Sequence, residues 1–130
     1  MGRNMGFESR IALIVDDNMV NIAVLKEMLK LENFNIEVAA TGNEAIQRLG
    51  KDPVVDIIFV DLMMPGMDGF ETIKLIRNHS KYKQTAVIAV TGMVGPEVEQ
   101  KCMNLGFSGY LTKPIYYDDL MDIIEGAMPE

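Results

Sequence analysis

Short apolar runs alternate with amphipathic segments along the chain, and this alternation constrains the fold more than any other feature. The apolar runs predict strands at 11–15, 35–39, 57–60, 86–90 and 109–112. The amphipathic segments predict helices at about 19–31, 41–49, 70–78, 96–106 and 117–127. Strands and helices in strict alternation favour an α/β fold, with a parallel sheet and helices on both faces.

Several details of these elements follow from residue type. The run at 57–60 is the most apolar, so we place it in the centre of the sheet. The first helix has Val20, Val24, Met28 and Leu31 at helical spacing, and these predict its buried face. Thr41 and Glu44 have the spacing of a capping box at the start of the second helix.

Length and composition limit the classes of protein that the chain can represent. A chain of 130 residues suits one domain, which we place at 10–128 after a flexible lead-in or tag remnant at 1–9. No apolar run approaches the length of a membrane span, and the start lacks the apolar stretch of a signal peptide. The single cysteine fits a reducing compartment, so we expect a cytoplasmic protein. The net charge of −7 argues against direct binding of nucleic acid.

Four of the predicted strands stop at polar residues, with carboxylates after two strands, a hydroxyl after another and an ammonium group after the last. Asp16 and Asp17 follow the first strand, Asp61 the third, Thr91 the fourth and Lys113 the fifth. The carboxyl ends of parallel strands are where ligands bind in such folds. Carboxylates suit Mg²⁺, and a lysine suits a phosphate group. The pattern therefore predicts a site for a divalent metal and a phosphoryl group.

Each of these residues also has an ordinary structural interpretation. An Asp after a strand often caps a helix, a Thr at a strand end is common, and most lysines are solvated. Pro114 marks Lys113–Pro114 as a candidate cis peptide bond, since cis bonds occur mainly before proline. Cys102 is expected to be buried packing, and His79 a surface residue at a helix end.

The ordered set of motifs resembles the receiver domain of two-component response regulators and hybrid histidine kinases. The residues that carry this resemblance are Asp16-Asp17, Asp61 with Met64-Pro65-Gly66-Met67-Asp68-Gly69, Thr91-Gly92, and Tyr110-Leu111-Thr112-Lys113-Pro114-Ile115. The resemblance covers about residues 10–128. It implies a flavodoxin-like (βα)5 fold, a doubly wound five-stranded parallel sheet with strand order 2-1-3-4-5.

The resemblance also implies a role for each site residue. Asp61 is the expected phosphoacceptor. The expected ligands of Mg²⁺, or of Mn²⁺ in its place, are Asp17 directly, Asp16 through a water, Asp61, and the backbone carbonyl of Met63. Lys113 would pair with Asp61 and then with the phosphoryl group, while Thr91 and Tyr110 would move on phosphorylation. Met63 and Gly92 are expected to tune the reaction, with no exceptional autodephosphorylation rate and open access for a partner.

The implied function is a phosphoacceptor switch in a His-Asp phosphorelay rather than an enzyme. Its expected partners are a histidine kinase or a histidine phosphotransfer domain and an unidentified output partner, with no nucleic acid or membrane insertion. Output is expected at the surface formed by the fourth helix, the fifth strand and the fifth helix. A homodimer that forms on phosphorylation through the fourth-helix surface is one option for this output.

Three other functions compete with this interpretation. A receiver-like interaction module that is never phosphorylated is the main alternative, although such modules usually lose an acidic residue or the lysine. A phosphatase with an Asp nucleophile resembling the haloacid-dehalogenase family has a second Asp two residues later, where this chain has Met63. A flavin-binding fold needs a phosphate-binding loop after the first strand, where Asp16 and Asp17 would repel phosphate.

Overall fold

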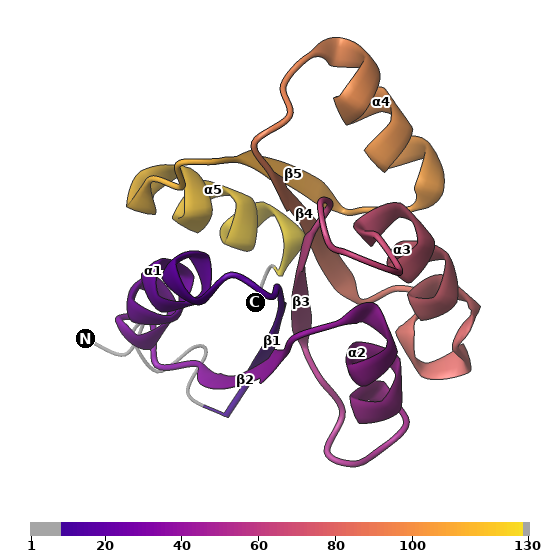
Figure 1. Cartoon of the computed structure of the whole chain (residues 1–130). Coiled ribbons are helices and arrows are strands. Elements are labelled where there is room, and N and C mark those ends of the chain that lie inside the picture. Colours follow the sequence, from indigo (N-terminus) through magenta and orange to yellow (C-terminus); the bar gives the residue numbers. More distant parts are fainter. Residues whose placement is uncertain (1–8, 129–130) are drawn as a thin grey trace.

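The computed structural model describes residues 9–128, and in this range a five-stranded sheet lies between two layers of helices (Figure 1). The strands are β1 (Ile11–Val15), β2 (Asn35–Ala39), β3 (Ile57–Asp61), β4 (Ala86–Thr91) and β5 (Gly109–Thr112). The helices are α1 (Met19–Lys30), α2 (Gly42–Leu49), α3 (Gly69–Asn78), α4 (Pro96–Leu105) and α5 (Tyr117–Ala127), with a short 3₁₀ helix η2 at Ser80–Tyr82. The predicted lead-in lies almost entirely outside the described residues.

The strands are all parallel and lie in the order β2-β1-β3-β4-β5, as predicted. Every residue of β1, β3 and β4 is buried. Apart from Asp61 and Thr91 at their carboxyl ends, these three strands are apolar, because helices cover both of their faces. The chain therefore winds outward from β1 in both directions, and the carboxyl ends of β1 and β3 lie side by side.

Side chains alternate between two hydrophobic cores, one on each face of the sheet. On one face Leu13 and Val60 pack with residues of α2, α3 and α4, among them the fully buried Cys102. On the other face Ile14 and Phe59 pack with residues of α1 and α5. Figure 1 shows the same division, with α1 and α5 together on one side of the sheet. The predicted buried position of Cys102 is confirmed.

The predicted buried face of α1 is wrong except at Met28, which is half-buried and packs against the core. Val20 and Leu31 are 71% and 69% exposed, and Val24 is also exposed, whereas Leu25 and Leu29 are the buried residues of this helix. Apolar side chains occur on more than one side of α1, so helical spacing alone allowed two faces. Only the sheet position decides between them, because it places the i and i+4 pair Leu25 and Leu29 against the core.

In residues 9–128, three α-helices begin with side-chain caps, α1 at Asn18, α2 at Thr41 and α3 at Asp68. The Thr41 hydroxyl accepts from the backbone N–H of Glu44 at 3.1 Å, but the Glu44 carboxylate accepts from Ala40 rather than from Thr41, so the predicted capping box is shifted by one residue. At α3 the capping box between Asp68 and Glu71 is complete. This cap fixes the end of the loop that follows Asp61, and so helps to position the site.

The remaining helix ends agree with the residue pattern. Pro96 stands in the first turn of α4, and Gly106 ends this helix in the left-handed conformation with φ 106°. His79 ends α3, and its ring Nδ1 accepts from the backbone N–H of Lys81. None of the helices within residues 9–128 combines the length and apolar character required to cross a bilayer.

Candidate functional site

The polar strand ends meet at one edge of the sheet. Asp61 and Thr91 are the last residues of β3 and β4, Asp16 directly follows β1, and Lys113 directly follows β5. Because β1, β3, β4 and β5 are adjacent in the sheet, their carboxyl ends bring these side chains together. The sequence therefore placed these residues on the correct edge.

The three carboxylates form a compact acidic cluster. One oxygen each from Asp16, Asp17 and Asp61 can be chosen so that all three lie within 4.8 Å of one another. Asp16 and Asp61 are buried, whereas Asp17 is exposed. Oxygen ligands with one side open to solvent suit Mg²⁺, which keeps several of its waters. The donor set therefore fits such a cation.

Lys113 is the cation that faces this cluster. Its Nζ lies 3.4 Å from Oδ1 of Asp61 and 3.8 Å from Oδ2 of Asp16. Its backbone N–H donates to the carbonyl of Thr91 at 2.8 Å, which continues the pairing of β5 with β4. The Lys113–Pro114 peptide bond is cis. The lysine is thus fixed at the strand end with its ammonium group at the acidic cluster.

The electrostatics of the cluster show unbalanced negative charge. Burial raises the pKa of Asp16 above its ordinary value, and the nearby Asp61 carboxylate raises it further. The Asn18 N–H, which donates to Asp16 Oδ1 at 2.9 Å, and the Lys113 ammonium oppose this rise. Two buried carboxylates with one half-buried lysine thus leave a site that a further cation would stabilise.

Thr91 and Tyr110 are joined through the backbone of one residue. The Met93 N–H donates to the hydroxyl oxygen of Thr91 at 3.0 Å, and the Tyr110 hydroxyl donates to the Met93 carbonyl. Thr91 is fully buried, and burial raises the pKa of Tyr110. The sequence did not point to Met93, because its backbone rather than its side chain makes these bonds.

Met63 contributes a backbone hydrogen bond to the site, whereas Gly92 leaves open space beside it. The Met63 N–H donates to Oδ1 of Asp61 at 3.1 Å, while the Met63 side chain is largely exposed. Gly92 lies beside Thr91, and a Cβ added there would meet no atom within 4 Å. The surface next to Thr91 is therefore open.

The family model for the response regulator receiver domain matches residues 12–125 of the chain. The chain belongs to this family. The family model thus covers all five strands of the sheet except the first residue of β1, as well as all the polar strand ends described above.

Similar proteins include both large kinases and small regulators. Hybrid signal transduction histidine kinase E of Dictyostelium discoideum is 36% identical over 118 residues, which are 88% of this chain and 7% of that kinase. The two-component response regulator ORR11 of Oryza sativa subsp. japonica is 30% identical over 117 residues, which are 90% of this chain and 80% of that regulator. The receiver chain thus spans less than a tenth of the kinase.

A solved receiver has nearly the same fold. The receiver domain of sensor histidine kinase PA1611 from Pseudomonas aeruginosa, described with a magnesium ion coordinated in its active site cleft, has a TM-score of 0.84 and 25% sequence identity. The match covers 94% of this chain and 99% of that one.

Residues of the acidic cluster line one hollow of this receiver, and a second hollow lies close by in the chain. The first, of about 240 Å³, lies between α1 and the segment after β5, and apolar residues such as Val20, Val24 and Ile115 line it together with Asp61. The second, of about 480 Å³, lies between the loops after β3 and β4. The cluster is therefore accessible from its surroundings, in keeping with a site that meets a partner.

Proposed function

We propose that this receiver accepts a phosphoryl group on Asp61 from a phosphohistidine of a histidine kinase or histidine phosphotransfer domain. The observation that carries the proposal is the position of the Asp61 carboxylate. It is buried at the end of β3, belongs to a three-carboxylate cluster, and lies 3.4 Å from the Lys113 ammonium. This arrangement combines an oxygen nucleophile with positive charge at the point where a phosphoryl group would bind.

We propose Mg²⁺ as the cofactor, with Mn²⁺ as a substitute. Asp16, Asp17 and Asp61 would hold the ion together with the backbone carbonyl of Met63. The magnesium described in the PA1611 receiver supports the assignment. The bound ion supplies charge neutralisation for the phosphoryl oxygens and the carboxylates.

The transfer itself is a displacement at phosphorus. An Asp61 carboxylate oxygen forms the new P–O bond while the P–N bond of the phosphohistidine breaks, and the bonding electron pair returns to the imidazole nitrogen. Lys113 stabilises the charge of the phosphoryl oxygens, and the Thr91 hydroxyl donates to one of them. Apart from the Asp61 nucleophile itself, the protein thus contributes positioning and charge stabilisation.

The hydrogen bonds of Met93 suggest how phosphorylation of Asp61 could change the conformation of the surface. If Thr91 turns toward the phosphoryl group, its hydroxyl oxygen moves relative to the Met93 N–H, and Met93 also accepts the hydroxyl of Tyr110. We propose that Thr91 and Tyr110 move together and change the surface of α4, β5 and α5. An output partner or a second copy of the chain would read this surface.

The lifetime of the phosphoryl group depends on how water reaches it. The apolar Met63 side chain provides only a weak hydrogen-bond acceptor for a hydrolytic water, so we propose an unexceptional rate of autodephosphorylation. The open position at Gly92 leaves the phosphoryl group accessible to a partner.

Incubation with Mg²⁺ and acetyl phosphate tests the proposal. Intact mass should increase by one phosphoryl group in the wild type and not in Asp61→Asn, while Asp56→Asn, a change at another carboxylate before β3, should still be phosphorylated. Without Mg²⁺ the gain should be lost. A wild-type protein that takes up no phosphoryl group, yet binds a receiver partner, would instead support the interaction module that is never phosphorylated.

A further inference from the structure

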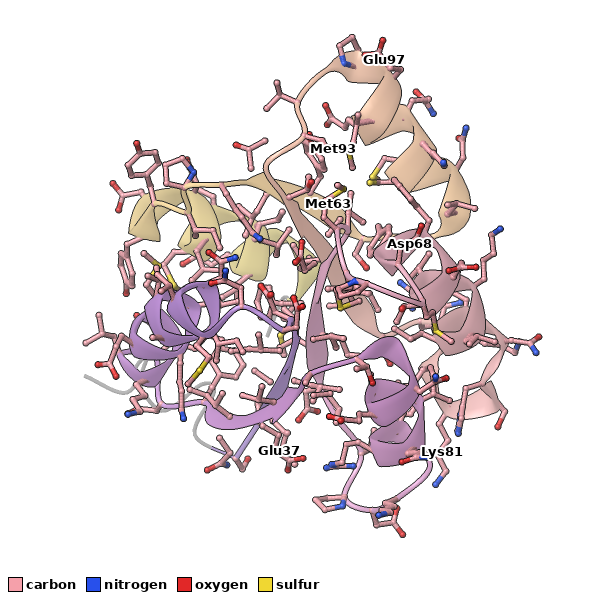
Figure 2. The ribbon with its side chains drawn as sticks, in the orientation of Figure 1. Glu37, Met63, Asp68, Lys81, Met93 and Glu97 are labelled. Carbon is pink, nitrogen blue, oxygen red and sulfur yellow. The ribbon has the colours of Figure 1, made fainter. Side chains whose placement is uncertain are left out.

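Two methionines line the hollow between the loops that follow β3 and β4. Met63 belongs to the loop after β3 and Met93 to the loop after β4, and both line the hollow of about 480 Å³ together with Met64 and Phe70. Figure 2 shows Met63 and Met93 near each other above the central strands. Met63 is 62% exposed, Met93 is half-buried and Met64 is buried. Their thioethers therefore differ in access to solvent.

Both methionines are bonded through their backbones to residues of the site. The Met63 N–H donates to Asp61 Oδ1 at 3.1 Å, and the Met93 N–H donates to Thr91 at 3.0 Å. Met63 is two residues from Asp61, the proposed phosphoacceptor, and its backbone N–H is hydrogen-bonded to the Asp61 carboxylate. A chemical change in the Met63 side chain therefore takes place close to this carboxylate.

We infer that Met63 is an oxidation site, and that its sulfoxide shortens the lifetime of the phosphoryl group on Asp61. The second half of this inference rests on the proposed function. The oxidant is a peroxide: the thioether sulfur gains one oxygen atom from hydrogen peroxide, the peroxide O–O bond breaks, and one water is released. Reduction of the sulfoxide by a methionine sulfoxide reductase reverses the change.

The expected direction follows from the polarity of the two side chains. A thioether is a weak hydrogen-bond acceptor, whereas a sulfoxide oxygen is polar and accepts strongly. A sulfoxide at Met63 can hold a water beside the phosphoryl group, in a position where the unmodified side chain cannot. Ordering one water by one ordinary hydrogen bond corresponds to a rate increase of roughly fivefold.

Other exposed methionines allow the effect of position to be separated from the effect of exposure. Met19 is 82% exposed at the start of α1, and Met103 is 45% exposed on α4. Neither shares a hydrogen bond with Asp61 in the described part of the chain. Both should be oxidised under the same conditions, and neither oxidation should change the phosphoryl lifetime.

The experiment measures phosphoryl loss before and after treatment with hydrogen peroxide. The protein is treated, freed of peroxide, phosphorylated with acetyl phosphate and Mg²⁺, and freed of donor, and the decay of the phosphorylated mass is followed. Peptide mapping locates the added oxygen. We expect oxygen at Met63 and roughly fivefold faster decay, with the original rate restored by methionine sulfoxide reductase.

Variants complete the test. Met63→Leu should make the decay rate insensitive to peroxide, whereas Met19→Leu and Met103→Leu should retain the wild-type response. Met63→Gln, which introduces a polar acceptor without oxidation, should decay faster than Met63→Leu. Oxidation at Met63 with an unchanged decay rate, or an undiminished peroxide response in Met63→Leu, would overturn the inference while leaving the proposed function intact. Failure of the untreated protein to take up a phosphoryl group would refute both.

Discussion

The ammonium group of Lys113 lies 3.4 Å from Oδ1 of Asp61, and the two residues come from the ends of strands that do not touch each other. Because β4 separates β3 from β5, the lysine reaches across the end of β4 to the carboxylate. The contact between Lys113 and Asp61 therefore depends on the relative positions of the ends of β3, β4 and β5. Among residues 9–128, Lys113 is the only basic residue that forms an ion pair with a carboxylate of the cluster.

Replacing Lys113 by Met should slow phosphorylation of Asp61. Loss of one charge-assisted interaction with the phosphoryl oxygens corresponds to about a 10- to 100-fold reduction in rate. The rate of phosphoryl uptake from acetyl phosphate, measured by intact mass, checks this expectation. Lys51→Met, a change at an exposed lysine in the loop after α2, is the control and should react at the wild-type rate. Equal rates for the wild type and Lys113→Met would remove Lys113 from the proposed mechanism.

The raised pKa of Asp16 predicts how the stability of the metal-free protein depends on pH. Because the folded state has the higher pKa, it retains a proton at pH values where the unfolded chain has lost it. This group therefore favours folding most below the unfolded pKa. Its contribution is lost as pH rises from that value through the raised pKa of the folded state. Above the raised pKa of the folded state, the ionised Asp16 opposes folding.

Asp16→Asn should accordingly stabilise the metal-free protein at pH 7, by on the order of 1 kcal/mol. The advantage should shrink as pH is lowered, because wild-type Asp16 then becomes neutral as well. Urea denaturation in the presence of a chelator, repeated across the pH range, measures both effects. Asp122→Asn, at an exposed position of α5, is the control and should change stability by less than about 0.5 kcal/mol. A variant less stable than the wild type at pH 7 would contradict the prediction.

The edge of the sheet that carries the site could be predicted from the sequence on physical grounds, whereas the strand order was implied by the resemblance to receiver domains. A parallel sheet places all strand ends of one kind at one edge, so Asp61, Thr91 and Lys113 meet there whatever the details of the loops. The buried face of α1 could not be predicted this way. Val20 and Val24 have the same helical spacing as Leu25 and Leu29, and only packing against the sheet distinguishes the two pairs.

Hydrogen bonds made by backbone groups also could not be predicted from the sequence. Met93 bonds Thr91 and Tyr110 through its N–H and carbonyl, and any residue type except proline could supply both groups. For Arg77, the sequence shows a hydrogen-bond donor but does not show which groups accept from it. The acceptors are three carbonyl groups and a hydroxyl that the fold brings together, so residue type alone could not predict them.

Arg77 joins α3 to two further segments, the one that leads into β4 and the one between α4 and β5. Its guanidinium donates to the carbonyls of Tyr82 at 2.8 Å, Thr85 at 2.7 Å and Gly106 at 2.9 Å, and to the hydroxyl oxygen of Ser108 at 3.3 Å. Burial lowers the pKa of Arg77. Arg77→Met should reduce the free energy of unfolding by about 2 to 3 kcal/mol, because partly buried carbonyls lose a charged donor.

Guanidinium chloride denaturation measures this loss. The control is Lys74→Met, which removes a positive charge from an exposed position of the same helix and should leave stability nearly unchanged. If both variants lose the same stability, the net charge of α3 matters rather than the hydrogen bonds of Arg77.

Gly69 shows how closely the start of α3 approaches Asp61, the proposed phosphoacceptor. A Cβ at this position would lie 2.7 Å from the backbone carbonyl oxygen of Asp61 and 2.7 Å from the Cα of Leu62. Neither backbone atom can move without shifting the end of β3. Gly69→Ala should therefore reduce the free energy of unfolding by about 2 kcal/mol and also slow phosphoryl uptake, because the Asp61 carboxylate is displaced.

Gly126 offers the opposite case within the same chain. A Cβ there would meet no atom within 4 Å, and the residue lies inside α5. Gly126→Ala should increase the free energy of unfolding by about 0.5 to 1 kcal/mol, because alanine favours the helix and restricts the unfolded chain, and phosphoryl uptake should not change. Urea denaturation and uptake of phosphoryl from acetyl phosphate, measured on both variants, compare the two sites. A Gly69→Ala protein as stable and as reactive as the wild type would mean that the start of α3 can move away from Asp61 without loss of stability or of phosphoryl uptake.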